Sequence, residues 1–345
     1  MRDTSIRKKV AIALVGVLAA VGGLGVSMHM IEARGLKDTG PGDTGEWGDE
    51  YEPESLFLAD TDYISEDEID AYLIAGTDGG GEDLGEGLNG ELADFIAVML
   101  IDNTTEKYAF YQIDRNSMVD VQVRSEDGDY SEYSYEQICT AHWYGIDETE
   151  RAENLMAAVS GLLGGIELDG YYILNMADIG KVNDAIGGVT VDIDTDMTNL
   201  DPEFVKGATV HLTDKQAERY LRARKDVGDG TNAARMARQR QYMQKAYNMV
   251  IGQLRENPEY INDLYIQLED KVESDGTGKR MSVITNQLAS YQSMGIITFD
   301  GETKIGDTID EGIEHEEFYT DENSILSGLK KVMNISVDQS ADDDE

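Results

Sequence analysis

Residues 95–114 read FIAVMLIDNTTEKYAFYQID, two apolar stretches separated by a polar turn. The first stretch, Phe95–Asp102, is apolar almost without interruption, which is typical of a strand buried on both faces. The second, Lys107–Asp114, alternates between polar and apolar residues and predicts a neighbouring strand, joined to the first by a turn at 103–106. These two strands are the expected centre of a β-sheet.

Outside this pair, expected strands and helices interleave along the chain. Apolar runs predict further strands at 71–76, 119–123, 171–174, 189–193 and 295–299. Apolar spacing and capping residues predict helices at 150–163, 177–186, 213–220, 232–255 (capped by Asn232), 258–272, 282–293 and 322–332. The class is therefore α/β or α+β, with a central mixed sheet flanked by helices.

The N-terminal segment has a different character. Residues 10–31 are almost wholly apolar and follow Arg7, Lys8 and Lys9. About 22 residues at a rise of 1.5 Å span roughly 33 Å, enough for a transmembrane helix. Basic residues before the segment place the N-terminus in the cytoplasm and the rest of the chain outside. A cleaved signal peptide is the alternative, but its apolar stretch is usually about 7–15 residues, so we favour an uncleaved single-pass anchor.

We expect five regions along the chain. They are a cytoplasmic N-terminus at 1–9, the anchor at 10–31, an acidic flexible linker at 32–69, a folded extracytoplasmic domain at 70–335 and an acidic disordered tail at 336–345. Since Cys139 is the single cysteine, no internal disulfide can form, and the domain depends on its core for stability.

Charge is distributed unevenly along the sequence. The chain has 28 Lys and Arg against 69 Asp and Glu, a net charge of −41, which argues against nucleic acid as a partner. Residues 219–245 nevertheless hold eight basic residues and two acidic ones. Arginine recognises phosphate and carboxylate oxygens with paired hydrogen bonds. This segment predicts an anion site, above all for phosphate.

The spacing within the basic segment sets conditions on its structure. Arg222 and Arg224 are two residues apart, so they point the same way only in an extended chain, and the preceding helix would have to end near Tyr220. A solvated helix face, with its arginines paired to the many carboxylates, is the alternative interpretation.

A second group of polar residues opens the long expected helix. Arg235, Arg238 and Gln239 lie at positions i, i+3 and i+4, which places them on one face of its first two turns. The free N–H groups and partial positive charge of a helix N-terminus also favour an anion there.

Two acidic residues stand at expected strand ends. Asp78 follows the first strand in a glycine-rich turn, and Asp94 precedes the buried strand Phe95–Asp102. Carboxylates so placed can hold Mg²⁺, which binds one or two of them and completes its shell with water and phosphate. In so acidic a chain an ordinary surface role is the alternative for each.

Five stretches together resemble the LytR–CpsA–Psr family. The resemblance covers roughly residues 70–250, and more weakly the chain to about 335. The stretches are IAGTD at 74–78, ADFIAVML at 93–100, QIDRNS at 112–117, NDAIGGVTV at 183–191 and LTDKQAERYLRARKDVGDGTNAARMARQRQY at 212–242.

The resemblance implies a membrane-anchored enzyme of the Gram-positive cell wall. Such enzymes transfer a glycopolymer from undecaprenyl pyrophosphate, through a phosphodiester, to a sugar hydroxyl of peptidoglycan. By matching position, Asp78 and Asp94 would hold Mg²⁺ (or Mn²⁺). The pyrophosphate would be bound, and its transfer catalysed, by Arg115, Arg222, Arg224, Arg235 and Gln239.

Two further residues receive roles from the same resemblance. Arg238 would be an additional substrate ligand, and Asp229 would act as a base or orient an arginine. The implied partners are the lipid-linked glycan, the peptidoglycan acceptor and the membrane. The polyprenyl tail would need an apolar tunnel between sheet and helices, for which we expect Phe95, Val98, Leu155, Leu162 and Ile179 as lining.

The chain also departs from the family pattern. A usual Pro-Arg-Asp is here 114–116 (DRN), Leu92 replaces a frequent arginine, and a Lys-Ile-Asn element is 137–139 (QIC). These changes remove positive charge from the site. They leave open two alternatives: a polyprenyl-phosphate lipid-binding carrier or envelope regulator without turnover, and a polyprenyl pyrophosphatase. We expect Cys139 and His142 to be structural.

Overall fold

The computed structural model describes most of the chain beyond residue 67, together with a short strand before it. The expected anchor at 10–31 and the acidic tail from 338 onward lie outside the described residues. Among the described helices, none is both long and apolar enough to cross a membrane. The described residues are 61–62, 68–78, 91–124, 130–145, 147–224, 227–257, 260–268, 270–276, 283–284, 287–288, 290–306, 315–333 and 336–337.

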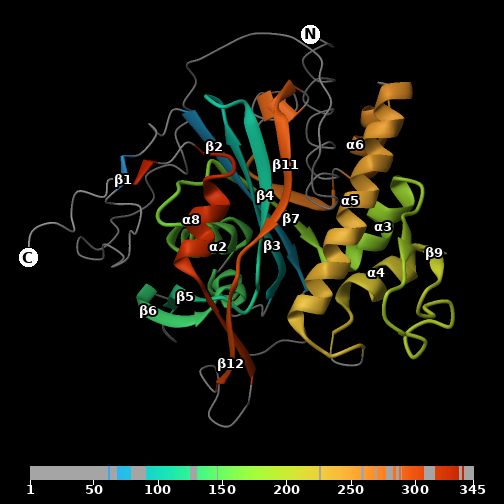
Figure 1. The fold of residues 1–345 in the computed structure, drawn as a ribbon, viewed down its shortest axis with the longest axis horizontal. Coiled ribbons are helices and arrows are strands. Elements are labelled where there is room, and N and C mark those ends of the chain that lie inside the picture. Colours follow the sequence, from blue (N-terminus) through green and yellow to red (C-terminus); the bar gives the residue numbers. More distant parts are fainter. Residues whose placement is uncertain are drawn as a thin grey trace, which may run out of the picture.

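A six-stranded mixed sheet forms the centre of the domain, in the order β10-β7-β2-β3-β4-β11 (Figure 1). Antiparallel pairing joins β2, β3 and β4, whereas β7 runs parallel to β2 and β11 parallel to β4. The edge strand β10 is antiparallel to β7. Their bounds are β2 Ile69–Thr77, β3 Ala93–Asp102, β4 Lys107–Ile113, β7 Gly170–Asn175, β10 Val272–Ser274 and β11 Gln292–Thr298.

The predicted hairpin at the centre is confirmed. Ile96 pairs with Ile113 and Asp102 with Lys107, so the polar turn falls where the sequence places it. Asp102 closes this turn, because its carboxylate accepts hydrogen bonds from the backbone of Thr104 (2.8 Å) and the hydroxyl of Thr105 (2.9 Å). These bonds satisfy a carboxylate that has no exposed surface.

Helices cover both faces of the sheet, which gives three layers (Figure 1). Side chains alternate along each strand, so Ile74 joins the core on one face and Leu73 the core on the other. The first face packs against α3 (Ile179–Ala185), α4 (Asp214–Arg222), α5 (Asn232–Glu256) and α6 (Tyr260–Leu268). The second packs against η2 (Ile138–Tyr144), α2 (Glu148–Leu162) and α8 (Glu322–Leu329). Burial on both faces explains why these strands are apolar throughout.

Smaller elements surround this core. Four two-stranded sheets and a short helix, η3, complete the described structure. The paired strands are β1 (Thr61–Asp62) with β14 (Ser336–Val337), β5 (Met118–Arg124) with β6 (Tyr130–Gln137), β8 (Thr190–Asp192) with β9 (Thr209–His211), and β12 (Gly301–Gly306) with β13 (His315–Thr320); η3 is Met176–Asp178. The β1–β14 pair joins residues that we expected in the linker and the tail.

Several predicted boundaries are wrong. The expected helix 258–272 ends at Leu268, and Val272 already belongs to β10. Similarly, Gln292 starts β11 instead of ending a helix. The N-cap of α5 is Thr231, whose hydroxyl accepts from the backbone N–H of Ala234 (3.2 Å), so Asn232 is the first helical residue.

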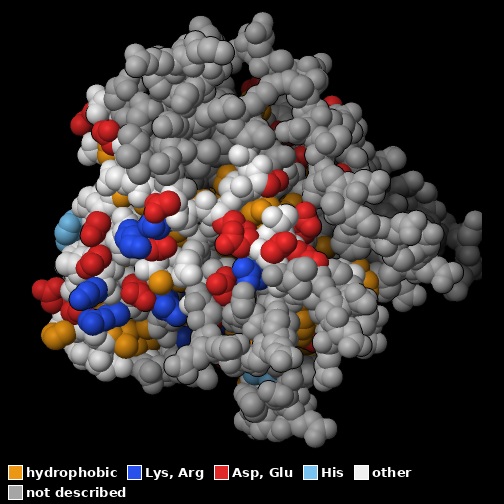
Figure 2. Space-filling view, turned by 180° about the vertical axis from the view of Figure 1, so that it is seen from behind, with side chains coloured by type: hydrophobic (Ala, Val, Ile, Leu, Met, Phe, Trp, Pro, Cys, Tyr) orange, Lys and Arg blue, Asp and Glu red, His pale blue; other side chains and the backbone are white. Residues whose placement is uncertain are grey.

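The surface carries the acidic excess of the chain. On the face seen in Figure 2, acidic side chains are spread widely over the described surface, whereas most basic ones lie toward one side. Most basic residues of the segment 219–245 lie on the helices α4 and α5.

We expect Leu73→Ala to lower the free energy of unfolding by roughly 2–5 kcal/mol, because Leu73 is fully buried in the sheet and its truncation leaves a cavity. Val205→Ala is the control, since Val205 is 47% exposed and its truncation should change stability by less than about 0.5 kcal/mol. Chemical denaturation of both variants measures the difference. An equal loss of unfolding free energy in the two variants would contradict the burial of Leu73 in the core.

Candidate functional site

A shared carboxylate lies at the centre of the candidate site. Asp94 is the second residue of β3, Arg115 follows β4 and Arg235 lies in the first turns of α5. Asp94 Oδ1 accepts hydrogen bonds from Nη1 of Arg115 and from Nη1 of Arg235 (3.2 Å). The exposed fractions of the three side chains are only 12%, 14% and 4%. The structure thus brings together three of the predicted residues from distant parts of the sequence.

Asn232 fixes the guanidinium of Arg235 from its other side. Its Oδ1 accepts from Nε (3.1 Å) and Nη2 (2.6 Å) of Arg235, and its Nδ2 donates to Oδ1 of Asp114 (2.5 Å). Burial raises the pKa of the Asp114 carboxyl, while bonds from Asn116 and Asn232 oppose that rise. Asn232 and Asp114 therefore position Arg235, a role that the sequence analysis missed because it treated Asn232 only as a cap.

A second ion pair extends the site toward β13. Arg224, in the chain after α4, donates through Nη2 to Oε2 of Glu316. Asn116 Nδ2 donates to the same carboxylate oxygen (3.3 Å), and Gln137 Nε2 donates to Oδ1 of Asn116 (3.2 Å). Glu316 was also missed, because it lies 92 residues from Arg224 in a strand without apolar periodicity.

Some donors of these arginines have no acceptor. Nε of Arg115 and Nε of Arg224 are buried and make no hydrogen bond within the described structure. Arg115 and Arg235 lie close together because both donate to Asp94 Oδ1. Burial lowers the pKa of Arg235, Asp94 opposes this shift, and the positive charges of Arg115 and Arg224 add to it. Since buried donors are nearly always satisfied, the unmet N–H groups indicate a site for an anion.

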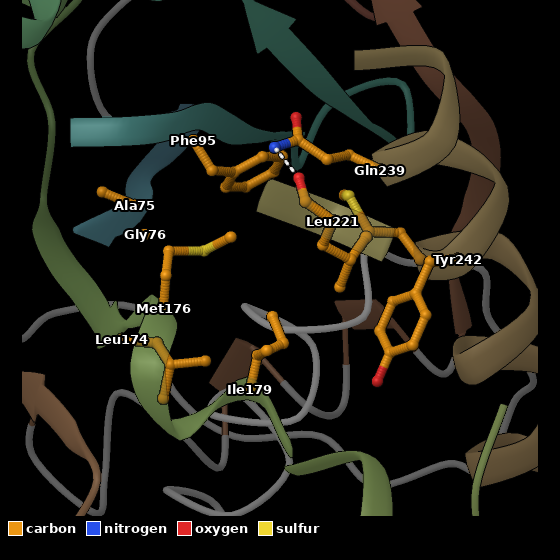
Figure 3. A pocket seen from close by; sticks show the side chains of 10 residues that line it. Ala75, Gly76, Phe95, Leu174, Met176, Ile179, Leu221, Gln239 and Tyr242 are labelled. Atoms are coloured by element: carbon orange, nitrogen blue, oxygen red, sulfur yellow. Dashed lines mark hydrogen bonds between the residues drawn. The ribbon is translucent and has the colours of Figure 1, made fainter. Parts of the chain in front are cut away.

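An apolar cavity adjoins this polar cluster (Figure 3). Gln239 lies at the boundary: its Oε1 accepts from Gln112 Nε2 (3.2 Å), its Nε2 donates to the carbonyl of Leu221 (3.5 Å), and it also lines the cavity. The cavity has an empty volume of about 360 Å³, including its opening to solvent. Its other lining residues are Ala75, Gly76, Phe95, Leu174, Met176, Ile179, Leu221, Tyr242 and Met243.

The expected tunnel lining is only partly right. Phe95 and Ile179 line the cavity, but Val98 and Leu155 belong to the core on the opposite face of the sheet, and Leu162 packs against that core. The reason is the alternation of side chains along a strand, since Phe95 and Val98 are three residues apart and so point to opposite faces. The other two are on α2, which covers the second face.

Three predicted residues have other contacts. Arg222 is the last residue of α4 and pairs with Glu218 one turn earlier (3.1 Å), so the helix runs two residues past the expected end at Tyr220 and Arg222 is not in extended chain. Arg238 donates through Nε to the carbonyl of Tyr220 (3.0 Å), and so holds the C-terminal turn of α4 against α5. Asp229 is exposed, and its carboxylate accepts hydrogen bonds from the backbone N–H (3.0 Å) and the hydroxyl (2.8 Å) of Thr231. These bonds, the backbone one most strongly, lower the pKa of Asp229 and make it a weaker base.

Asp78 is held at the end of β2, beside the start of β3. Its N–H donates to the carbonyl of Leu92 (3.1 Å), and the N–H of Leu92 donates to Asp78 Oδ1 (3.0 Å). The ladder shifts register here, because Gly76 pairs with Phe95 but Thr77 with Ala93, which leaves Asp94 as the extra residue of a bulge. Bulges often direct a side chain into a site, and the bulge residue here is Asp94, which accepts hydrogen bonds from Arg115 and Arg235.

Carboxylate oxygens near the bulge are the kind of ligand that a magnesium ion takes. Asp78 and Asp94 supply two carboxylates, the number that Mg²⁺ commonly takes from a protein. Among the described residues no group of three or more His, Cys, Asp or Glu side chains is placed to hold a metal. A resident ion would therefore have to complete its shell with water and substrate oxygens.

Cys139 and His142 are both buried beside the site. Arg115 Nη2 lies 3.0 Å from Cys139 Sγ, and burial raises the pKa of this thiol. Cys139 thus packs as expected but also contacts a site arginine. His142 Nδ1 donates to the backbone carbonyl of Glu91 (3.0 Å), and burial lowers the pKa of its imidazole to about 4.

The sequence profile of the LytR_cpsA_psr family matches residues 52–331. The chain belongs to this family. A curated relative, the polyisoprenyl-teichoic acid–peptidoglycan teichoic acid transferase TagU of Bacillus mycoides, is 29% identical over 185 residues, which cover 54% of each chain. The LytR_cpsA_psr chain described here thus spans about half the length of the curated relatives that it matches.

Solved structures share the fold of this LytR_cpsA_psr chain. Bacillus subtilis TagV superposes with a TM-score of 0.53 and 18% identity, over 77% of this chain and 96% of TagV. A structure of TagT bound to LI-WTA gives a TM-score of 0.54 and 16% identity, over 77% of this chain and 90% of TagT. At these identities the likeness concerns the fold, which confirms the mixed sheet flanked by helices.

We expect the buried His142 to make stability depend on pH. Its pKa is about 4 in the folded protein and about 6.5 in the unfolded chain, so the unfolded chain binds the proton first as the pH falls. Stability that is fully present above pH 6.5 is therefore lost as the pH falls toward 4, by roughly 3 kcal/mol for this group.

The matched variant is His142→Asn, which keeps an N–H donor for Glu91 but cannot titrate. Denaturant unfolding at pH 7 and pH 4 should show a smaller loss in the variant than in the wild type, because the carboxylates titrate equally in both. Identical losses would rule out a neutral buried imidazole at this position.

Proposed function

We propose that this LytR_cpsA_psr domain is a Mg²⁺-dependent phosphotransferase. It would move a glycopolymer from an undecaprenyl-pyrophosphate-linked precursor to peptidoglycan, with a phosphodiester as the new link. The supporting observation is that an arginine cluster adjoins an apolar cavity, at Gln239 and Phe95. Among the described residues, two buried N–H groups of this cluster have no hydrogen-bond acceptor. Such a junction suits an amphiphile with an anionic head and a hydrocarbon tail. The transferase name of the TagU relatives and the wall-teichoic-acid complex of TagT support the same class.

The arginines would bind the diphosphate and stabilise the charge that develops during transfer. Arg115, Arg224 and Arg235 are held by Asp94, Glu316 and Asn232 before any ligand arrives, so little reorganisation is required. The oxygen of the acceptor hydroxyl forms a bond to the phosphorus that carries the sugar, and its proton passes to solvent water. The bond between that phosphorus and the bridging oxygen breaks, and polyprenyl phosphate leaves with the bridging oxygen and its electron pair.

Asp78 and Asp94 would hold the magnesium ion beside the bulge of β3. A bound Mg²⁺ would neutralise charge on the phosphate oxygens and orient them. Asp94 already contacts Arg115 and Arg235 through Oδ1, so one carboxylate would link the ion to the guanidinium groups. Mn²⁺, which accepts similar oxygen ligands, would be expected to substitute.

The substrate also accounts for the apolar N-terminal segment. We propose that residues 10–31 form a single-pass anchor, with the N-terminus in the cytoplasm and the domain on the outer side of a Gram-positive membrane. This location would bring the cavity to the leaflet in which a polyprenyl tail resides. Cysteine labelling with a membrane-impermeant reagent, on either side of the segment, would establish the topology.

We expect Arg235→Ala to reduce transfer by at least about 100-fold, because removing one fixed donor to a developing charge typically has an effect of this size. Arg224→Gln should also lower the transfer rate, and it tests a residue that is less buried, with 21% of its side chain exposed. The control is Arg219→Ala. The side chain of Arg219 is 50% exposed and contacts the carboxylate of Asp201 and the carbonyl of Leu200. Transfer of labelled glycopolymer from a polyprenyl-pyrophosphate donor to peptidoglycan measures all three.

The same assay separates the alternatives. Wild-type rates in folded Arg235→Ala and Arg224→Gln would contradict the proposal. Release of polymer phosphate into water without transfer would indicate a pyrophosphatase, and recovery of intact bound lipid would indicate a carrier or regulator without turnover.

We expect removal of divalent cations by EDTA to abolish transfer, with recovery on addition of Mg²⁺. Asp78→Asn should raise the Mg²⁺ concentration required for half-maximal rate by about tenfold, since one of two carboxylate ligands loses its charge. Asp214→Asn, at the exposed first turn of α4, is the matched control. An unchanged Mg²⁺ requirement in Asp78→Asn would remove Asp78 from the cation site.

A further inference from the structure

The β5–β6 ribbon has one buried and one exposed face. Val121 is fully buried and points into the core. The register pairs Asp120 with Tyr135 and Gln122 with Tyr133, and these side chains share the opposite face. Tyr133 is 37% exposed and Tyr135 is 50% exposed. Two large aromatic rings thus lie two residues apart on the solvent-facing side of one strand, and exposed apolar groups that gather in this way can mark an interaction site.

Acidic groups surround these rings. Asp120 lies directly opposite Tyr135, and the pKa values of Tyr133 and Tyr135 are raised first by burial and then by Asp120. β13 packs against β5, and the hydroxyl of Tyr319 in β13 donates to Oε2 of the buried Glu317 (2.7 Å). The surface thus combines aromatic rings with the exposed carboxylate of Asp120.

This surface continues into the functional site. Gln137 is two residues beyond Tyr135 on the same face of β6, and it donates to Asn116 and to the backbone carbonyl of Glu316 (2.5 Å). At about 3.4 Å per residue, Tyr135 and Tyr133 are roughly 7 Å and 14 Å along the strand from Gln137. Figure 1 shows the β5–β6 ribbon and the β12–β13 hairpin at the same end of the molecule.

We propose that this tyrosine face, formed by Asp120, Tyr133, Tyr135 and Tyr319, binds sugar rings of the acceptor glycan strand. The flat faces of the tyrosines would stack against the C–H faces of the sugars. Carboxylate and phenol oxygens would accept and donate hydrogen bonds with hydroxyl and acetamido groups. That the bound glycan is the acceptor of the transfer reaction rests on the proposed function, whereas the binding of sugars to this face does not.

Charge distinguishes the acceptor from the donor polymer. Asp120 and Glu317 border the rings, and Lys304, which lies 4.4 Å from the ring centre of Tyr319, is paired with Glu302 (3.2 Å). A phosphate-rich polymer would be repelled by these carboxylates. An uncharged chain of N-acetylated sugars avoids that repulsion, so it is the occupant we assign.

Calorimetric titration of the full-length protein with a tetramer of N-acetylglucosamine tests the proposal. The double substitution Tyr133→Ala and Tyr135→Ala should weaken binding at least about tenfold, as expected for loss of two aromatic contacts. Tyr133→Phe and Tyr135→Phe keep both rings and should stay within about threefold of the wild type. Ile305→Ala removes an exposed apolar side chain outside the tyrosine face and should leave affinity unchanged.

Equal affinity in the wild type and the folded alanine variant would overturn the proposal. Tighter binding of a phosphate-containing glycopolymer at the same tyrosines would also overturn it, because the charge argument would then be wrong. The titration contains no lipid donor and no turnover. Its failure is therefore distinguishable from a failure of transfer, which would leave sugar binding intact.

Discussion

The sharing of Asp94 between Arg115 and Arg235 is the constraint on which the rest of the site depends. A buried charge is tolerated only when paired and hydrogen-bonded, and here one carboxylate oxygen accepts a hydrogen bond from each of two guanidinium groups. The arrangement requires the start of β3, the end of β4 and the first turns of α5 to meet within a few ångströms. The sheet register and the Thr231 cap provide that accuracy.

Around this pair the site is organised in two zones. Within the part of the chain that the structure describes, the polar zone has two buried guanidinium N–H groups without an acceptor, on Arg115 and Arg224, and the apolar zone is the cavity beyond Gln239. A ligand that satisfies both would also stabilise the fold, because anything that binds only the native state shifts the folding equilibrium toward it.

The sequence predicted the parts of the fold that are governed by burial. β3 and β4 are apolar because both faces of the sheet are covered, so the hairpin and the layered class could be inferred. β12 and β13 could not, since both lie largely at the surface and carry polar side chains. Within the site, helical spacing pointed to Arg235 and the family resemblance to Arg115, but Glu316 reaches Arg224 only through tertiary structure. The continuation of α4 to Arg222 overrode the extended chain that the spacing of Arg222 and Arg224 suggested.

The contact of Arg238 with the last turn of α4 has a mechanical consequence. Leu221 of α4 and Tyr242 of α5 both line the cavity, and Arg238 fastens these two helices together next to its polar end. The separation of the helices is thereby fixed where the headgroup would sit. Any widening needed for a long hydrocarbon chain must therefore occur farther along, toward Ile179. The two helices would separate there, with the contact of Arg238 as the hinge.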